Sequence, residues 1–385
     1  MNRPLQHADS HPAAVPADGQ GGFTLVEMLV AASITLVIMG AVASLFGTFG
    51  RSASQTQKII ELTGTMRSAA WQLRKDLAGI TVDPRPPLAP EANAGYLEII
   101  EGPLSDNSAA TGTSNIVADV DDILLFTTRS LGDPFSGRVG GGRLESPTAE
   151  VAWFCKNTGQ TLGTQTLFNL HRRQLLVSAY PGVNFGNGDD LSMRLENGSP
   201  VPNSLGDLTK RENRFLHLGS QQPFPFTAQI PTNNTNNRFG EVLSGDRAGE
   251  DIVLRNVLAF DVRVFDPKSP NNRFAYVDLG RQPPGNPATV LTGAANPRSK
   301  LTATYDTWST HYEFNGIDDD GDNEIDEGTN GLDDDGNGAI DDVGELETLP
   351  PYPVPLRGLE VRIRCWEPSS RQIRQITVRH TFVAH

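Results

Sequence analysis

The apolar residues of the chain form one long run close to the N-terminus. Residues 1–22 are polar and end in two glycines, and residues 23–49 are then apolar with Glu27 as the only charge. About 20 apolar residues are enough for a helix to span a bilayer. A secretory signal is cleaved behind its apolar core, whereas here a polar leader that ends in glycine comes before that core. The pattern therefore predicts a membrane-spanning helix.

The helix is expected to continue beyond the membrane as an amphipathic segment. The apolar run is followed by no proline before Pro84, and apolar residues recur every three or four positions over residues 59–77. This spacing is typical of a helix that buries one stripe. We therefore expect one helix whose first part, residues 23–49, lies in the membrane and whose second part, residues 50–83, packs on a globular head.

After the prolines the pattern changes to a period of two, which is typical of β-strands. Leu359, Val361 and Ile363 alternate with polar or charged residues. The sequence Glu-Pro-Ser-Ser at residues 367–370 favours a hairpin turn between the last two strands. The expected strands are residues 96–100, 123–128, 150–155, 167–176, 253–265, 359–366 and 373–382. The sequence thus predicts an α+β fold with a β-rich head over residues 84–385.

Three long polar stretches separate these strands. They cover residues 102–121, 181–250 and 268–304, in a chain that contains 38 Gly and 27 Pro. Connecting segments of this composition usually run over a protein surface. We interpret all three as surface insertions on the head, not as separate domains.

The net charge of −14 arises in one segment. Residues 315–347 contain 14 acidic residues and no Lys or Arg, so that the rest of the chain has 32 basic residues against 46 − 14 = 32 acidic ones. The sequence has no basic patch of the kind that binds nucleic acid. We therefore expect no nucleic-acid partner.

The acidic segment is an internal repeat. Its first copy begins Asn315-Gly-Ile-Asp-Asp-Asp-Gly, and 15 residues later the second begins Asn330-Gly-Leu-Asp-Asp-Asp-Gly. Oxygen ligands at alternate positions are typical of calcium loops, and the spacing resembles dockerin and EF-hand loops without their bidentate glutamate at position twelve. The candidate ligands are Asp318, Asp320, Asp322, Glu324, Asp326 and Glu327 in the first copy, and Asp333, Asp335, Asn337, Asp341 and Asp342 in the second. We expect one or two calcium ions; the alternative is a solvated acidic tether.

The two cysteines, Cys155 and Cys365, both lie on expected strands and face the core. In an oxidising compartment they could pair, and free buried thiols are equally compatible with the pattern.

Nothing in the sequence indicates catalysis. The seven histidines are scattered, and the chain has no Gly-x-Ser-x-Gly elbow, His-Glu-x-x-His pair or phosphate-binding loop. We expect a protein without enzymatic activity, with a membrane-tethered hydrolase as the alternative.

The sequence from Gly22 to Glu27, Gly-Phe-Thr-Leu-Val-Glu, resembles the class III signal of type IV pilins and type II secretion pseudopilins. The resemblance implies the pilin fold, and a prepilin peptidase that removes residues 1–22 and methylates the new amine of Phe23. It also implies an inner-membrane protein with a periplasmic head, which assembles with other pilins or pseudopilins through its helix. Glu27 would then face the amino terminus of a neighbouring subunit; the alternative is that it reaches the headgroup region.

Three further segments are similar to those of J-type minor pseudopilins. They are residues 70–77 at the helix end, residues 254–266 and the closing hairpin after Pro355. The resemblance implies a tip complex that starts a short filament and contacts secreted cargo. PilW-like minor pilins of type IV pili share this architecture, and the sequence leaves both subfamilies open.

Overall fold

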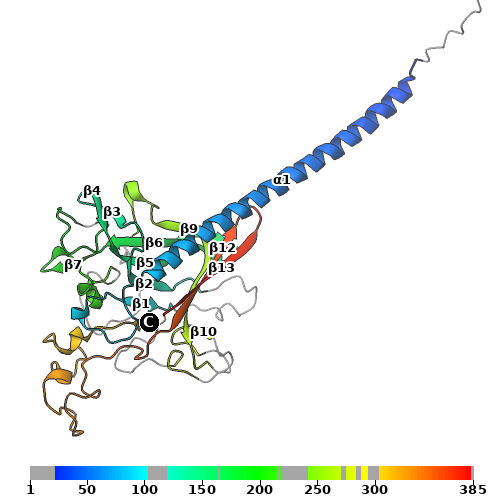
Figure 1. Cartoon of the computed structure of the whole chain (residues 1–385). Helices are drawn as coiled ribbons and strands as arrows, with labels where there is room; N and C mark the ends of the chain where they lie inside the picture. Colours follow the sequence, from blue (N-terminus) through cyan, green and yellow to red (C-terminus); the bar gives the residue numbers. More distant parts are fainter. Residues whose placement is uncertain are drawn as a thin grey trace, which may run out of the picture. The chain divides into compact units, whose positions relative to one another are not determined.

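The computed structural model describes residues 22–102, 119–163, 165–186, 188–215, 217, 242–269, 275–282, 288–293 and 303–382. The chain divides into two compact units, Met1–Gln57 and Lys58–His385. Helix α1 (Leu25–Ala78) contributes residues to both units (Figure 1). The helix expected from the sequence is therefore confirmed, although it begins two residues later and ends five residues earlier than residues 23–83.

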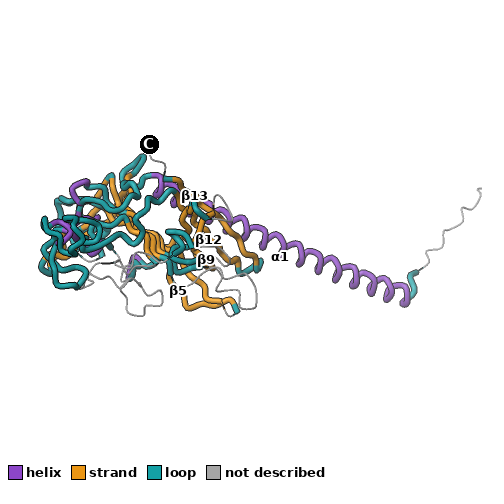
Figure 2. The backbone as a smooth tube through the Cα atoms, turned by 90° about the horizontal axis from the view of Figure 1, so that it is seen from below, coloured by secondary structure: helices purple, strands orange, loops and turns teal. Residues whose placement is uncertain are grey.

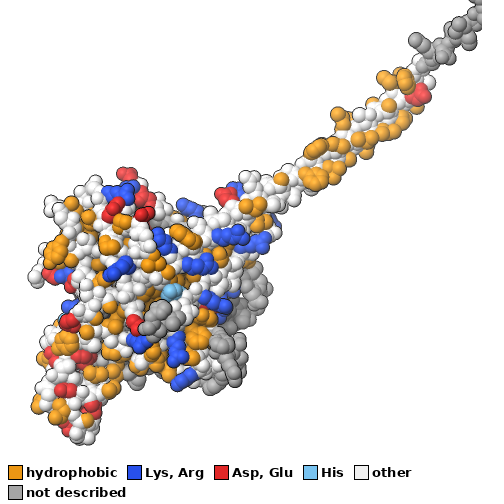
Figure 3. All heavy atoms as spheres, in the orientation of Figure 1, with side chains coloured by type: hydrophobic (Ala, Val, Ile, Leu, Met, Phe, Trp, Pro, Cys, Tyr) orange, Lys and Arg blue, Asp and Glu red, His pale blue; other side chains and the backbone are white. Residues whose placement is uncertain are grey.

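The part of α1 in the first unit exposes its apolar side chains. Leu36 and Val37 are 70% and 72% exposed, and Figure 3 shows apolar side chains along this part of the helix. The helix is long and apolar enough to cross a membrane. In water such a surface would be unfavourable, so the segment is suited to lipid or to the helices of other subunits.

The second unit is built on a nine-stranded antiparallel sheet (Figure 2). Its strands are β1 (Leu97–Ile100), β2 (Ile123–Arg129), β5 (Thr148–Leu162), β6 (Gln165–Leu176), β9 (Ile252–Asp266), β10 (Ala275–Val277), β11 (Thr304–Asp306), β12 (Gly358–Glu367) and β13 (Gln372–Thr381). Their order is β11-β1-β2-β5-β6-β9-β12-β13, with β10 beside β9. All seven expected strands are present, and β12 and β13 form the expected hairpin. The α+β fold class is confirmed.

Two small hairpins and several short helices complete the described structure. The hairpins are β3 (Phe135–Val139) with β4 (Gly142–Ser146), and β7 (Met193–Glu196) with β8 (Ser199–Pro202). The 3-10 helices are η1 (Pro90–Ala92), η3 (Asp207–Thr209), η4 (Arg211–Asn213), η5 (Gly245–Arg247), η6 (Thr310–Glu313) and η7 (Glu327–Thr329). Neither hairpin was predicted from the sequence. Their two-residue turns are Gly140-Gly141 and Asn197-Gly198, and all four residues have positive φ. Gly-Gly and Asn-Gly are the dipeptides that such hairpin turns favour, so these two pairs are the sequence signal that could have revealed them.

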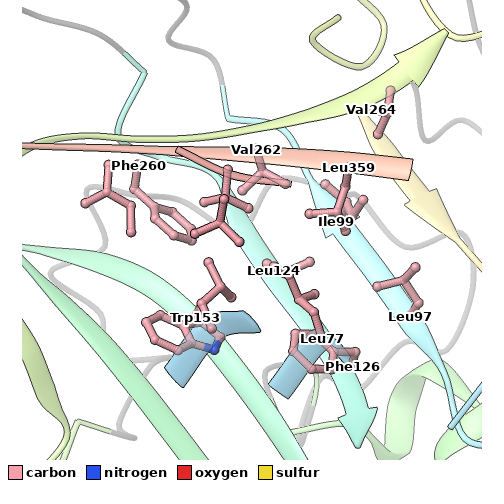
Figure 4. Close-up of a cluster of buried hydrophobic side chains, with 14 of the residues drawn as sticks. Leu77, Leu97, Ile99, Leu124, Phe126, Trp153, Phe260, Val262, Val264 and Leu359 are labelled. Carbon is pink, nitrogen blue, oxygen red and sulfur yellow. The ribbon is translucent and has the colours of Figure 1, made fainter. Parts of the chain in front are cut away.

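The main core lies between the second half of α1 and one face of the sheet. Met66, Ala69, Ala70, Leu73 and Leu77 are at most 2% exposed and form the expected apolar stripe. Figure 4 shows Leu77 among side chains from β1, β2, β5, β9 and β12. The two alanines have short side chains, which lets the helix backbone approach the sheet closely.

A buried carboxylate fixes the end of α1 to the sheet. The Asp76 side chain is fully buried and accepts hydrogen bonds from Arg172 Nε (2.6 Å) and Nη2 (2.8 Å), and from Trp153 Nε1 (3.0 Å). Thr128 Oγ1 donates to the Asp76 carbonyl oxygen (2.7 Å). Bidentate pairing between a guanidinium and a carboxylate is strong and directional. Asp76 therefore connects the helix with β2, β5 and β6.

The polar stretch 181–250 is not wholly a surface insertion, because η3, η4 and Arg214 contribute buried residues. The expectation was also wrong for the described part of 268–304, where β10 pairs with β9 and Leu279 and Leu291 are buried in the core. Arg211 and Arg214 have side chains that are 2% and 1% exposed, and both pair with Glu98 on β1 at 2.6 Å and 2.9 Å. Arg214 also pairs with Asp306 on β11. Burial alone would raise the pKa of Glu98, but Arg211, His217 and Arg214 outweigh it and hold this pKa well below its usual range.

This network explains why a polar segment is buried. Each charge has a partner of opposite sign, so the cost of removing it from water is offset. Residues 218–241 of the same stretch lie outside the described residues, as do residues 103–118 and parts of the stretch 268–304.

The Asp76 contacts predict a large loss of stability when its charge is removed. Asp76→Asn leaves the Arg172 guanidinium, only 12% exposed, without its carboxylate. We expect the free energy of unfolding to fall by about 3–5 kcal/mol. The measurement is denaturant unfolding of the full chain in detergent, followed by tryptophan fluorescence.

A matched control is Asp83→Asn. Asp83 pairs with Arg85 at 2.9 Å, but their side chains are 61% and 55% exposed. Loss of such a surface pair costs at most about 1 kcal/mol. Equal effects of the two variants would contradict the role given to Asp76.

Candidate functional site

The N-terminus of α1 is closed by a capping box. The Thr24 hydroxyl accepts a hydrogen bond from the Glu27 backbone N–H (3.3 Å), and the Glu27 carboxylate accepts one from the Thr24 backbone N–H (3.0 Å). The pair thus satisfies two backbone donors that the start of a helix would leave without partners. Sequence analysis gave Glu27 a role only between subunits, although the spacing Thr-x-x-Glu is the signal for this cap.

Gly22 and Phe23 precede the cap, and neither packs against the rest of the described chain. Phe23 is 82% exposed. A Cβ atom added at Gly22 would meet no atom within 4 Å, and the glycine has no positive φ. Neither packing nor backbone conformation requires a glycine at this position. A requirement for it would have to come from another molecule.

The two copies of the acidic repeat fold alike, at one end of the head (Figure 1). Three kinds of hydrogen bond in the first copy recur 15 residues later in the second. They are Asn315 Nδ2 to Asp319 and Asn330 Nδ2 to Asp334; Gly316 N–H to Asp326 and Gly331 N–H to Asp341; Asn323 N–H to Asp318 and Gly338 N–H to Asp333. The sequence repeat is therefore also a structural repeat.

The first copy gathers three carboxylates of its own, and the second gathers two of its own and one from Glu345, which follows it. One oxygen from each of Asp318, Asp320 and Asp322 lies within 4.8 Å of the others, and the same holds for Asp333, Asp335 and Glu345. The structure thus brings together the first three ligand candidates of copy one and the first two acidic ones of copy two.

The later ligand candidates have other contacts. Asp326 and Asp341 accept from the glycine N–H groups named above, and Asp342 accepts from Gly344 N–H (2.5 Å) and Asn337 Nδ2 (2.8 Å). Glu324 is exposed. Glu327 is buried beside Glu347, and its burial together with that carboxylate raises the pKa of Glu327 to about 8.

Sequence analysis missed the part played by Glu345 and Glu347, which follow the repeat. Glu345 accepts from the backbone N–H groups of Asp334 (2.6 Å) and Asp342 (3.0 Å). Glu347 accepts in the same way from Asp319 (2.7 Å) and Asp326 (2.9 Å) in the first copy. Each glutamate therefore joins two points of one loop. Both lie outside the repeated sequence, so the repeat itself gave no signal for them.

One comparison with known proteins bears on the N-terminal segment. Residues 18–43 match the family model described as the prokaryotic N-terminal methylation motif. This is the prepilin signal of type IV pilins and pseudopilins, and the match includes Gly22, Phe23 and Glu27. The chain is pilin- or pseudopilin-like.

The motif and the single apolar helix near the N-terminus fit a single-pass membrane anchor, and a motif of this type indicates a structural subunit that assembles with other pilins. Comparison with curated proteins and with solved structures finds no match.

The cysteines and two of the histidines belong to the interior of this pilin-like head. Cys155 on β5 and Cys365 on β12 are both free thiols, and β6 and β9 lie between their strands. Of the two pairing states that the sequence left open, the structure has the unpaired one. His171 Nδ1 lies 3.2 Å from Asp251 and His217 Nε2 lies 3.0 Å from Glu98, and both contacts are buried.

Proposed function

We propose that this chain is a minor pseudopilin, a structural subunit of a type II secretion pseudopilus that takes part in its tip or initiation complex. One observation carries the proposal: the methylation motif leads directly into an apolar helix that continues into an antiparallel β-head. The polar leader, residues 1–22, would be removed by a prepilin peptidase, and the mature chain would begin at Phe23 with a methylated amine. Gly22 supports this step, since nothing among the described residues requires a glycine there.

The J-type assignment rests on three similar segments that meet in one core. The helix end, residues 70–77, contains Asp76; residues 254–266 lie within β9; the closing hairpin is β12 with β13. β9 pairs with β12, and the apolar stripe of the helix packs on both. A PilW-like minor pilin for pilus assembly, adhesion or motility would use the same segments and is the second candidate. In either case the chain would be an inner-membrane protein with a periplasmic head, where secreted cargo could contact it.

Glu27 would act in assembly by exchanging partners. In the single chain its carboxylate caps its own helix through Thr24. In a filament, the amino terminus of a neighbouring subunit would approach it and neutralise a charge that is unfavourable in the membrane. The capping box holds the carboxylate at the helix start, so it is positioned for this encounter before assembly.

Two substitutions separate the cap from the charge. Glu27→Gln keeps an acceptor oxygen, because capping boxes use either Glu or Gln, whereas Glu27→Val removes both the cap and the charge. We expect both variants to insert in the membrane and both to lose most of their incorporation into filaments. Immunoblotting of sheared filament fractions measures this. Normal incorporation of Glu27→Gln together with failure of Glu27→Val would mean that Glu27 acts only as a cap.

Deletion of the gene distinguishes the two subfamilies. A minor pseudopilin is needed to start the secretion filament, so deletion should abolish export of exoproteins and leave pilus-dependent motility unchanged. Exoprotein activity in culture supernatants and twitching zones on agar are the two readouts. Loss of motility with normal secretion would instead favour the PilW-like minor pilin.

We also propose that the acidic repeat binds calcium, with one ion in each copy. Support comes from the two carboxylate triads and from the common fold of the copies. Calcium prefers six to eight oxygen ligands in flexible loops, and neighbouring backbone carbonyls and waters would complete each shell. Without a cation, 14 carboxylates in residues 315–347 repel one another, with no Lys or Arg among them.

Paired substitutions test each copy separately in the full chain in detergent. Asp318→Asn with Asp320→Asn should remove one calcium-binding event in calorimetry, and Asp333→Asn with Asp335→Asn should remove another. A ligand at a hundredfold excess over its Kd stabilises the folded state by about 2.7 kcal/mol for each site, so the melting temperature in calcium should fall in each variant. Magnesium should give a smaller shift. Unchanged stoichiometry and melting temperature in both variants would leave the acidic tether as the better account.

A further inference from the structure

Three carboxylates meet inside the head, far in sequence from the acidic repeat. Glu101 follows β1, and Asp119 and Asp122 precede β2. One oxygen from each lies within 4.8 Å of the others. Glu101 is 4% exposed, and Asp119 and Asp122 are each 1% exposed. Carboxylates are rarely buried so completely unless they are paired or coordinate a metal ion.

Backbone hydrogen bonds hold this cluster in place. Asp122 accepts from the N–H groups of Gly102 (3.2 Å) and Val262 (2.6 Å), one at each oxygen. The Phe260 N–H donates to the carbonyl oxygen of Asp119 (2.8 Å). The segment that carries Asp119 and Asp122 is thus attached to β9 at two points. The position of each carboxylate is set by the fold and not by a flexible side chain alone.

Gly102 allows another acidic residue to approach closely. A Cβ atom at this position would lie 2.1 Å from Cγ of Asp121, so the Asp121 side chain would have to move for any other residue. The chain therefore uses a glycine where it brings a further carboxylate to the edge of the cluster.

Asp119 has a buried carboxylate that no cationic side chain or backbone N–H group satisfies. Among the described residues, neither of its oxygens accepts a hydrogen bond from such a group, and the Asp121 carboxyl that lies against it adds further negative charge. In the same part of the chain Glu101 accepts no hydrogen bond, and the cationic group beside it is Arg281, with Nε 3.4 Å from Glu101 Oε1. One guanidinium cannot balance three carboxylates. A buried carboxylate without a partner costs several kcal/mol, so the cluster as it stands lacks positive charge.

Arg263 on β9 pairs with carboxylates outside the cluster. Arg263 Nε lies 3.1 Å from Asp261 and 3.0 Å from Asp278. Burial and the neighbouring carboxylates raise the pKa of Glu101, of Asp119 and of Asp122 above their usual range. The cluster must therefore take up either protons or a cation.

The oxygens of the cluster are close enough together for one cation to contact all three, since they lie within 4.8 Å of one another. Calcium is bound by protein oxygens, whereas magnesium usually keeps several of its waters, so a buried set of protein carboxylates favours calcium. A donor set made only of oxygen also favours a hard cation over zinc or copper.

We propose that Glu101, Asp119 and Asp122 form a buried binding site for one calcium ion, separate from the acidic repeat. The ion supplies the positive charge that Asp119 lacks and ties the segment before β2 to the end of β1 and, through Asp122, to β9. It is a structural site, because its ligands are enclosed by the head.

Calorimetry on a variant of the full chain tests the site apart from the repeat. The parent protein carries Asp318→Asn, Asp320→Asn, Asp333→Asn and Asp335→Asn, is purified in detergent and is freed of metal with a chelator. Titration with calcium chloride should show one remaining binding event. Adding Asp119→Asn, which keeps the shape but removes the charge, should abolish that event and the calcium-dependent rise in melting temperature. Adding Asp133→Asn, at an exposed carboxylate, should change neither.

The competing account is that the cluster shares protons. In that case the folded parent binds no calcium in the titration, and its melting temperature is the same in calcium as in chelator. Either result overturns the proposal. If Asp119→Asn does not fold, Glu101→Gln replaces it, and the stoichiometry of the folded parent still decides. A binding event that persists in both variants places the ion elsewhere and also overturns the proposal.

Discussion

The pairing of Asp76 with Arg172 is the interaction on which the docking of helix and sheet depends. Apolar burial drives the second half of α1 onto the sheet, but it is not directional, and a helix displaced by one turn would still present an apolar stripe. A buried carboxylate tolerates no such displacement, because it must meet the guanidinium of Arg172 and the indole N–H of Trp153. The pair therefore selects one register from several that would bury similar areas.

The buried carboxylates of the head differ in whether a group of opposite charge lies beside them. Asp76 and Glu98 are matched by arginines from distant segments, and these pairs organise the core and the edge of the sheet. The acidic repeat keeps most of its carboxylates near the surface, where water reduces their repulsion. Asp119 is buried without a matching group. This contrast within one molecule is the physical reason for placing a cation there.

Local patterns in the sequence were enough to predict the helix, the long strands and the last hairpin, because each of these has a period of its own. Leu359, Val361 and Ile363 alternate over a strand buried on one face, and all three are fully buried. Long-range pairs could not be predicted in this way. Arg211 lies more than a hundred positions from Glu98, and its segment has the composition of a surface loop. Glu345 was missed for a similar reason, since it completes a triad from outside the repeat.

The central claim is that the chain is made as a prepilin and matures at the boundary between its polar leader and its apolar helix. Mass spectrometry of the N-terminus of the protein from wild-type cells tests it most directly. The account predicts a chain that begins at Phe23 and carries a methyl group on its amine. An intact Met1, or a cut beyond Phe49, would contradict it.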